Sequence, residues 1–177
     1  METEFSVYSW ILENIAVIEA AILLIGVFLT IRTLKAHKQE SKNLATLNLI
    51  IHQRSDEKFN KSLDLLTDLI KKQQGNAYMD LSSYLLADKK SEEAKAIFEV
   101  LNFREFVAVG INSGIIDEKT YKRAYCSVFV RDWENLKHTV EAVRKDLGKD
   151  TMFQDFEKLA TKWKNKPLKN INKKLLK

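Results

Sequence analysis

The segment from Tyr8 to Ile31 constrains the fold more than any other part of the chain, because it is the only run long and apolar enough to favour a lipid environment. Its main part, residues 10–31, contains 22 residues. As an α-helix with a rise of about 1.5 Å per residue, this part would extend roughly 33 Å, close to the hydrocarbon thickness of a bilayer. We therefore expect residues 10–31 to form a transmembrane helix, preceded by an extracytoplasmic leader of residues 1–9.

Polar residues inside the run leave an alternative open. Glu13 and Asn14 lie within one turn of Trp10, where headgroup water can solvate them. Glu19 lies about two turns deeper, where a carboxyl group is costly unless it is neutral or partnered. The alternative interpretation is a core helix of a soluble helical bundle.

The charges on the two sides of the run predict its orientation. The leader contains two glutamates and no basic residue, whereas four basic residues follow the run: Arg32, Lys35, Lys38 and Lys42. Basic flanks stay in the cytoplasm, and a cleavable signal peptide has the opposite order of charge. We expect an uncleaved single-pass anchor with its N-terminus outside and its C-terminus in the cytoplasm.

The composition favours an all-α fold of modest size. The chain has 177 residues with 5 glycines and 1 proline, which argues against Gly-rich nucleotide folds and β-sandwiches. The single cysteine, Cys126, lies in the apolar run AYCSVFV and is expected in the core, with a reactive thiol as the alternative. We predict one transmembrane helix followed by a long amphipathic helix and a small cytoplasmic helical bundle.

Residues 32–75 are predicted to form a juxtamembrane amphipathic helix that ends near Gly75. Its apolar residues recur at steps of three or four, apart from one gap of eight residues. The expected inward stripe is Leu44, Leu47, Ile51, Phe59, Leu63, Leu66 and Ile70.

Residues 76–164 are predicted to form a helical domain. A short helix is expected between Asn76 and Asp88, followed by a helix from Glu92 to Val109 with Ser91 as its N-cap. This second helix is apolar on more than one face, so we expect it to be the central packed element, with Phe106 in the core. A break is expected between Gly110 and Gly114.

Two further helices complete the predicted domain. Asp117 is the expected N-cap of a long helix that ends at Gly148, and Asp150 is the expected N-cap of the last helix, which ends before Pro167. The residues expected to face inward in the long helix are Tyr121, Tyr125, Val128, Phe129, Trp133, Leu136, Val140, Val143 and Leu147, and those in the last helix are Phe153, Phe156, Leu159, Ala160 and Trp163.

The segment LNFREFVAVGINSGIIDEKTY, residues 101–121, resembles a family of uncharacterised bacterial and prophage proteins known as domain-of-unknown-function family 4760. The resemblance implies a short leader, one membrane helix and a helical cytoplasmic region. It also implies a bacterial inner (plasma) membrane and a setting such as phage exclusion or anti-phage defence. The family has no assigned catalytic or binding residues.

The residues do not predict an enzyme, a cofactor or a metal site. His37, His52 and His138 are scattered and are expected at the surface. The glycines are not clustered as in a phosphate-binding loop, and no nucleophile elbow is present. A hydrolase would require acidic side chains that converge in a pocket.

One stripe of the membrane helix is a candidate helix-packing seam. Small and polar residues recur there at steps of four and three, an arrangement that favours helix association in lipid. The candidate residues, within a stripe that begins at Leu12 and also includes Leu23 and Thr33, are Ala16, Glu19, Gly26 and Thr30. The alternative is a lone helix on which Glu19 reaches the interface or stays protonated.

The basic tail, residues 165–177, contains five lysines and no acidic residue, which equals the whole excess of 29 basic over 24 acidic side chains. Its candidate residues for contact with anionic lipid or nucleic acid are Lys166, Lys169, Lys173, Lys174 and Lys177. A solvated end is the alternative. We expect membrane lipid and a protein partner or a second copy as partners, and a membrane-tethered nucleic-acid-binding protein is the competing hypothesis.

Overall fold

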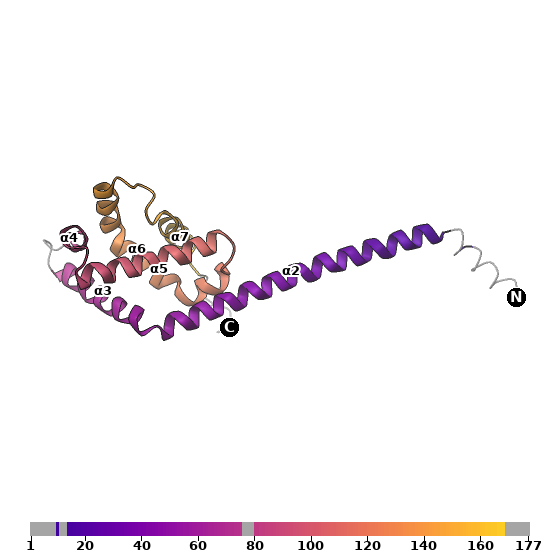
Figure 1. The fold of residues 1–177 in the computed structure, drawn as a ribbon, viewed down its shortest axis with the longest axis horizontal. Helices are drawn as coiled ribbons and strands as arrows, with labels where there is room; N and C mark the ends of the chain where they lie inside the picture. Colours follow the sequence, from indigo (N-terminus) through magenta and orange to yellow (C-terminus); the bar gives the residue numbers. More distant parts are fainter. Residues whose placement is uncertain (1–9, 11–13, 76–79, 169–177) are drawn as a thin grey trace, which may run out of the picture. The chain divides into compact units, whose positions relative to one another are not determined.

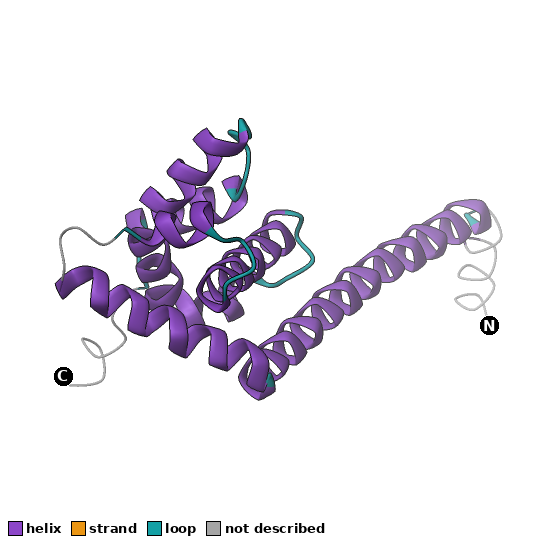
Figure 2. Cartoon of the chain, turned by 60° about the vertical axis from the view of Figure 1, so that its left-hand side comes forward, coloured by secondary structure: helices purple, strands orange, loops and turns teal. Residues whose placement is uncertain are grey.

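The computed structural model describes residues 10, 14–75 and 80–168. Within these residues the secondary structure is helical, with short connections and no strand, so the predicted all-α fold is confirmed (Figure 2). The helices, labelled in Figure 1, are α2 (Ile15–Ser55), α3 (Glu57–Gly75), α4 (Leu81–Ala87), α5 (Glu92–Asn112), α6 (Glu118–Leu147) and α7 (Gln154–Asn165).

The chain divides into an N-terminal unit, Met1–Ser41, and a C-terminal unit, Lys42–Lys177. The C-terminal unit therefore includes residues 42–75, which the sequence analysis treated as a separate segment. Helix α2 has residues in both units, because residues 32–55 contain neither glycine nor proline to end it.

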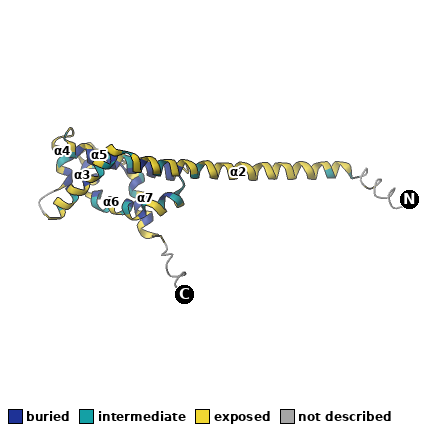
Figure 3. Ribbon diagram, turned by 90° about the horizontal axis from the view of Figure 1, so that it is seen from below, coloured by how far each residue is buried: buried dark blue, intermediate teal, exposed yellow. Residues whose placement is uncertain are grey.

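The described part of the N-terminal unit contains a helix that is long and apolar enough to cross a membrane. None of its most apolar stretch is buried, and Figure 3 shows this part of α2 in the colour of exposed residues. A core helix of a soluble bundle would be mostly buried, so the exposure is consistent with membrane anchoring.

Helix α5 is the central element of the C-terminal unit, as predicted. It packs against α3, α4 and α7, and α6 packs against α4 and α7 (Figure 1). The core that these helices enclose includes Phe59, Leu66, Leu81, Leu85, Ile97, Val100, Leu101, Val107, Tyr121, Cys126, Phe129, Leu136, Val140, Phe156 and Trp163. The predictions of Cys126 in the core and of the inward residues of α7 are confirmed.

Three helix ends confirm the predicted caps. The side chain of Ser91 accepts a hydrogen bond from the amide of Ala94, and that of Asp117 accepts one from Thr120. Gly148 ends α6 in the left-handed conformation, with φ of 61°.

The predicted helix of residues 32–75 is in fact two helices. The helix is interrupted at Asp56, inside the predicted gap between Ile51 and Phe59. The Asp56 carboxylate caps α3 by accepting a hydrogen bond from the amide of Phe59 at 3.0 Å. The predicted end at Gly75 is confirmed.

The predicted inward stripe is wrong in its first half. Leu44, Leu47 and Ile51 are 55%, 46% and 61% exposed, whereas Thr46 and Gln53 are buried. The face of α2 toward the core carries these two polar side chains, whose hydrogen-bond partners are described below, together with the partly buried Leu49 and Ile50.

The prediction that Phe106 lies in the core is also wrong, since its side chain is 62% exposed. The neighbouring helices cover the face of α5 that carries Arg104, Val107 and Ala108, all of which are buried. Phe106 and Val109 lie on the uncovered face of this helix.

The predicted break between Gly110 and Gly114 is confirmed, although α5 continues to Asn112, three residues beyond the predicted end at Val109. Gly110 instead permits a close approach: a Cβ atom there would lie 2.4 Å from the Cδ1 atom of Ile116. Gly114, with φ of 73°, makes the turn that follows.

The predicted N-cap at Asp150 is wrong, because α7 begins at Gln154. A carboxylate from another helix takes the role of the cap. Glu105 of α5 accepts the amide hydrogens of Asp155 at 3.3 Å and of Phe156 at 2.8 Å. This cap could not be predicted from the sequence, because Glu105 is 50 positions before Asp155.

Candidate functional site

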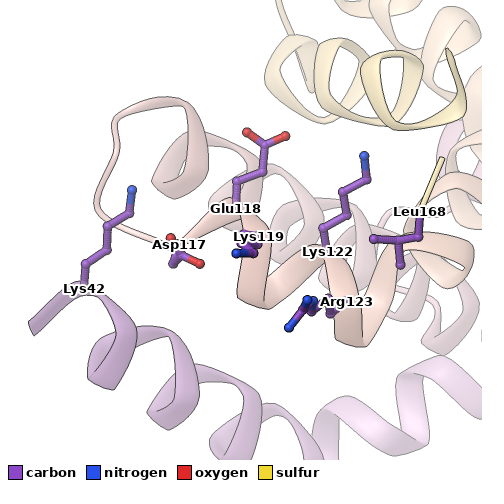
Figure 4. Close-up of a pocket in the computed structure, with 7 residues that line it drawn as sticks. All are labelled: Lys42, Asp117, Glu118, Lys119, Lys122, Arg123 and Leu168. Atoms are coloured by element: carbon purple, nitrogen blue, oxygen red, sulfur yellow. The ribbon is translucent and has the colours of Figure 1, made fainter. Parts of the chain in front are cut away.

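A cavity of about 910 Å³ in the C-terminal unit is a candidate binding site. Figure 4 shows its residues: one side chain from α2, a row from the first turns of α6, and a leucine that follows α7. The lining residues are Lys42, Asp117, Glu118, Lys119, Lys122, Arg123 and Leu168.

Hydrogen bonds fix the two helices that form this cavity. The backbone amide of Asp117, at the start of α6, donates to the hydroxyl of Thr46 on α2 at 2.8 Å. The same hydroxyl donates to the carbonyl of Lys42 at 2.7 Å. These bonds hold the first turn of α6 beside the turn of α2 that carries Lys42.

The basic side chains on α6 share one face because of their spacing. Lys119, Lys122 and Arg123 stand at positions i, i+3 and i+4, which lie next to one another on a helix. Together with Lys42 they give the cavity four cations against two carboxylates.

The two carboxylates of the cavity already serve the fold. Asp117 caps α6. Glu118 accepts hydrogen bonds from Lys162 at 2.7 Å and from the indole of Trp163 at 3.0 Å. Burial acts to raise the pKa of Glu118, but these hydrogen bonds and the positive charge of Lys162 outweigh it and leave the pKa below its ordinary value.

Three of the four cations that line the cavity, Lys42, Lys119 and Arg123, have no such role, and Lys122 is the exception. The Lys122 ammonium donates to the carbonyl of Lys166 and lies 5.8 Å from the ring centre of Trp163. Within the described residues, no hydrogen bond or ion pair engages the side-chain nitrogens of Lys42, Lys119 or Arg123. The cavity therefore presents uncompensated positive charge.

A separate group of polar side chains is buried and serves the core. Arg104 on α5 is fully buried, and its Nε and Nη2 atoms donate to one carboxylate oxygen of Asp132 on α6 at 3.0 and 2.8 Å. Tyr121 donates to the side-chain oxygen of Gln53 at 2.9 Å, and burial raises the pKa of its phenol. These side chains connect helices within the core, and none of them lines the basic cavity.

The proposed membrane seam lies on exposed positions of α2 in the N-terminal unit. Ala16, Glu19, Gly26 and Thr30 are all exposed, and the Thr30 hydroxyl donates to the carbonyl of Gly26 at 2.8 Å. A Cβ atom at Gly26 would meet nothing within 4 Å. The structure leaves this face without a partner, so the seam stays a prediction.

The basic tail is mostly outside the described residues. Lys166 is the C-cap of α7, whereas Lys169, Lys173, Lys174 and Lys177 are not described. The three histidines are exposed, as predicted. In the part of the chain that the structure describes, no three His, Cys, Asp or Glu side chains gather as metal ligands.

The sequence analysis missed the basic cavity. The i, i+3, i+4 spacing of Lys119, Lys122 and Arg123 directly after an N-cap was the available signal. The contribution of Lys42 could not be foreseen, because it depends on the hydrogen bond between Asp117 and Thr46, which are 71 positions apart.

Comparison with known proteins supports the resemblance noted from the sequence. The family model described as "Domain of unknown function (DUF4760)" matches residues 20–163. No curated protein matches the chain, and no solved structure matches it.

Proposed function

The chain belongs to the DUF4760 family, and for this member we propose a membrane-anchored protein whose helical unit is a protein-interaction module that binds a second copy of the chain. The observation that carries the proposal is the exposed apolar stripe of α2, which we define as Leu44, Leu47 and Ile51. Fully burying a large apolar side chain contributes about 1.5 to 3 kcal/mol, so a partner that covers this stripe on both copies gains substantial free energy.

The spacing of the stripe supports a second copy as the partner. In the sequence, steps of three and four lead without a break from the candidate membrane seam to the exposed apolar stripe. The positions before the stripe are Ala16, Glu19, Leu23, Gly26, Thr30, Thr33, His37 and Glu40. This is the heptad repeat by which parallel helices pair. Two copies anchored in one membrane are already parallel and in register.

The positions of the charges also fit self-association. Arg32, Lys35, Lys38 and Lys42 all fall outside the heptad positions that form the seam. Two identical copies would therefore pair without placing lysines opposite one another. The seam positions between the apolar run and the stripe are Thr33, His37 and Glu40, and the His37 Nδ1 and Glu40 Oε2 atoms lie 3.9 Å apart within one chain.

We place the helical unit in the cytoplasm, with α2 as an uncleaved anchor in a bacterial inner membrane. The basic residues after the apolar run support the orientation. The use of Thr46 and Gln53, on the same helix, as hydrogen-bond partners of α6 supports retention of the helix. A role in phage exclusion or anti-phage defence rests on the family resemblance, and no catalytic step is part of the proposal.

Disulfide cross-linking in membranes tests this function. Leu47→Cys places a thiol on the exposed apolar stripe, where the same residue of the second copy faces it. We expect an oxidant to convert this variant to a covalent dimer.

Ala45→Cys is the matched control, because Ala45 is also exposed but lies two positions away, off the heptad seam. Both variants retain the buried Cys126, so its contribution cancels. Equal cross-linking of the two variants, or none in either, would disprove pairing through this stripe.

A further inference from the structure

We infer that the basic cavity between α2 and α6 binds the phosphate of an anionic lipid headgroup. The inference concerns a different face of the unit from the exposed apolar stripe and does not depend on pairing of two copies. Its starting point is the charge described above: four cations line the cavity, and both carboxylates are held by hydrogen bonds within the protein.

The free cations are suited to a phosphate. Arg123 offers a planar guanidinium that can bind two oxygens of one phosphate, and Lys119 and Lys42 add two ammonium groups to the lining of the same cavity. Figure 4 shows these side chains coming from two helices, with Lys42 on α2 facing the row on α6. A cavity of about 910 Å³ lies within the size range of small-molecule sites.

The position of the cavity in the chain favours lipid over a soluble phosphate compound. Lys42 follows Ile31, the last residue of the apolar run, by eleven positions. Even a fully extended chain of that length reaches only about 40 Å, so a membrane anchored by the run keeps headgroups within reach. Three other basic residues occupy the intervening segment: Arg32, Lys35 and Lys38.

The other end of the chain leads to the same cavity. Leu168 lines it, and the Lys122 ammonium donates to the carbonyl of Lys166, so the first residues of the basic tail, 166–168, lie at the cavity. Leu168 is 46% exposed and adds an apolar surface next to the cations. An amphiphile with an anionic headgroup offers both kinds of contact, whereas inorganic phosphate offers one.

Native mass spectrometry of the full chain in detergent tests the inference. The protein is titrated with phosphatidylglycerol or with phosphatidylcholine of the same acyl chains, and the dissociation constant for each lipid is measured. We expect phosphatidylglycerol to bind at least about tenfold more tightly. The variant Lys119→Ala/Arg123→Ala removes two exposed cations and should weaken phosphatidylglycerol binding about 30-fold, equivalent to about 2 kcal/mol.

The control variant Lys145→Ala/Lys149→Ala removes the same charge from exposed positions at the other end of α6 and should change binding by less than about twofold. Equal weakening in the two variants would overturn the inference, as would equal affinity of the wild type for both lipids. Displacement of the lipid by an equal concentration of inorganic phosphate or of a single-stranded oligonucleotide would also overturn it, by assigning the cavity to a soluble phosphate or to nucleic acid.

Discussion

Arg104 shows how individual residues hold the C-terminal unit together. Its guanidinium is fully buried, and its Nε and Nη2 atoms both donate to the same carboxylate oxygen of Asp132. The Cζ atom of Arg104 lies 5.9 Å from the ring centre of Phe103 and 5.8 Å from that of Phe129. A buried charge that loses its partner costs roughly 3 to 5 kcal/mol. The pair therefore holds α5 against α6, and loss of either partner would leave an unpaired buried charge between the two helices.

Phe106 and Phe129 provide the test of burial at the scale of the residue. Phe106 is 62% exposed, whereas Phe129 is fully buried, with ring centres 4.8 Å from Phe156 and 4.9 Å from Trp163. We expect Phe106→Ala to change the free energy of unfolding by no more than about 0.5 kcal/mol and Phe129→Ala to lower it by roughly 3 to 5 kcal/mol. Urea denaturation of the full chain in detergent, followed by tryptophan fluorescence, measures both.

The comparison depends on the difference between the two variants. A loss for Phe106→Ala that approaches that of Phe129→Ala would mean that something covers the outer face of α5. A second copy bound there instead of at α2 would be the first explanation to examine, because exposed apolar patches mark interaction sites.

At the scale of the element, α7 depends on a cap that another helix supplies. Glu105→Ala removes the acceptor for the amides of Asp155 and Phe156 and should cost about 1 to 2 kcal/mol. Burial raises the pKa of Glu105, although the two amide hydrogen bonds act to lower it. The negative charge of the carboxylate therefore adds little to the stability of the fold. Glu105→Gln keeps one oxygen acceptor and should therefore lose less than half as much.

Hydrogen exchange of the Asp155 and Phe156 amides measures this cap directly. Protection of both amides should fall in Glu105→Ala, whereas Glu105→Gln, which keeps one acceptor oxygen, should retain protection at one of the two amides. Equal exchange in the two variants would show that the carboxylate acts through its charge and not as an acceptor.

Helices and faces differ in how far the sequence predicts them. Spacing of three and four, together with Ser91, Asp117 and Gly148, predicted α5 and α6, the start of each helix and the end of α6, because those signals are local. The covered face of α2 was not predictable in this way. Thr46 and Gln53 are buried only because Asp117 and Tyr121 lie opposite them, and no local pattern shows that pairing.

The two candidate sites also differ in how far the sequence predicts them. The membrane run and its basic flank are contiguous in the sequence and could be recognised there. The basic cavity combines α2, α6 and Leu168, and its net charge depends on the engagement of Glu118 by Lys162 and Trp163. Three-dimensional contacts of this kind decide which charges are free, and composition does not reveal them.

At the scale of the whole molecule, we propose a chain that is anchored by one helix and paired along that same helix. The most direct measurement is the mass of the protein particle in detergent by sedimentation, with the detergent contribution subtracted. We expect the wild type to have the mass of two copies. The variant Leu44→Ser/Leu47→Ser/Ile51→Ser should have the mass of one copy at the same concentration, because it removes the apolar contact on both chains.

The matched control for this measurement is Phe106→Ser/Val109→Ser, which replaces exposed apolar residues of α5 and should keep the mass of two copies. Two results would contradict pairing through the exposed apolar stripe of α2. One is a wild type with the mass of one copy, and the other is a triple serine variant that keeps the mass of two copies.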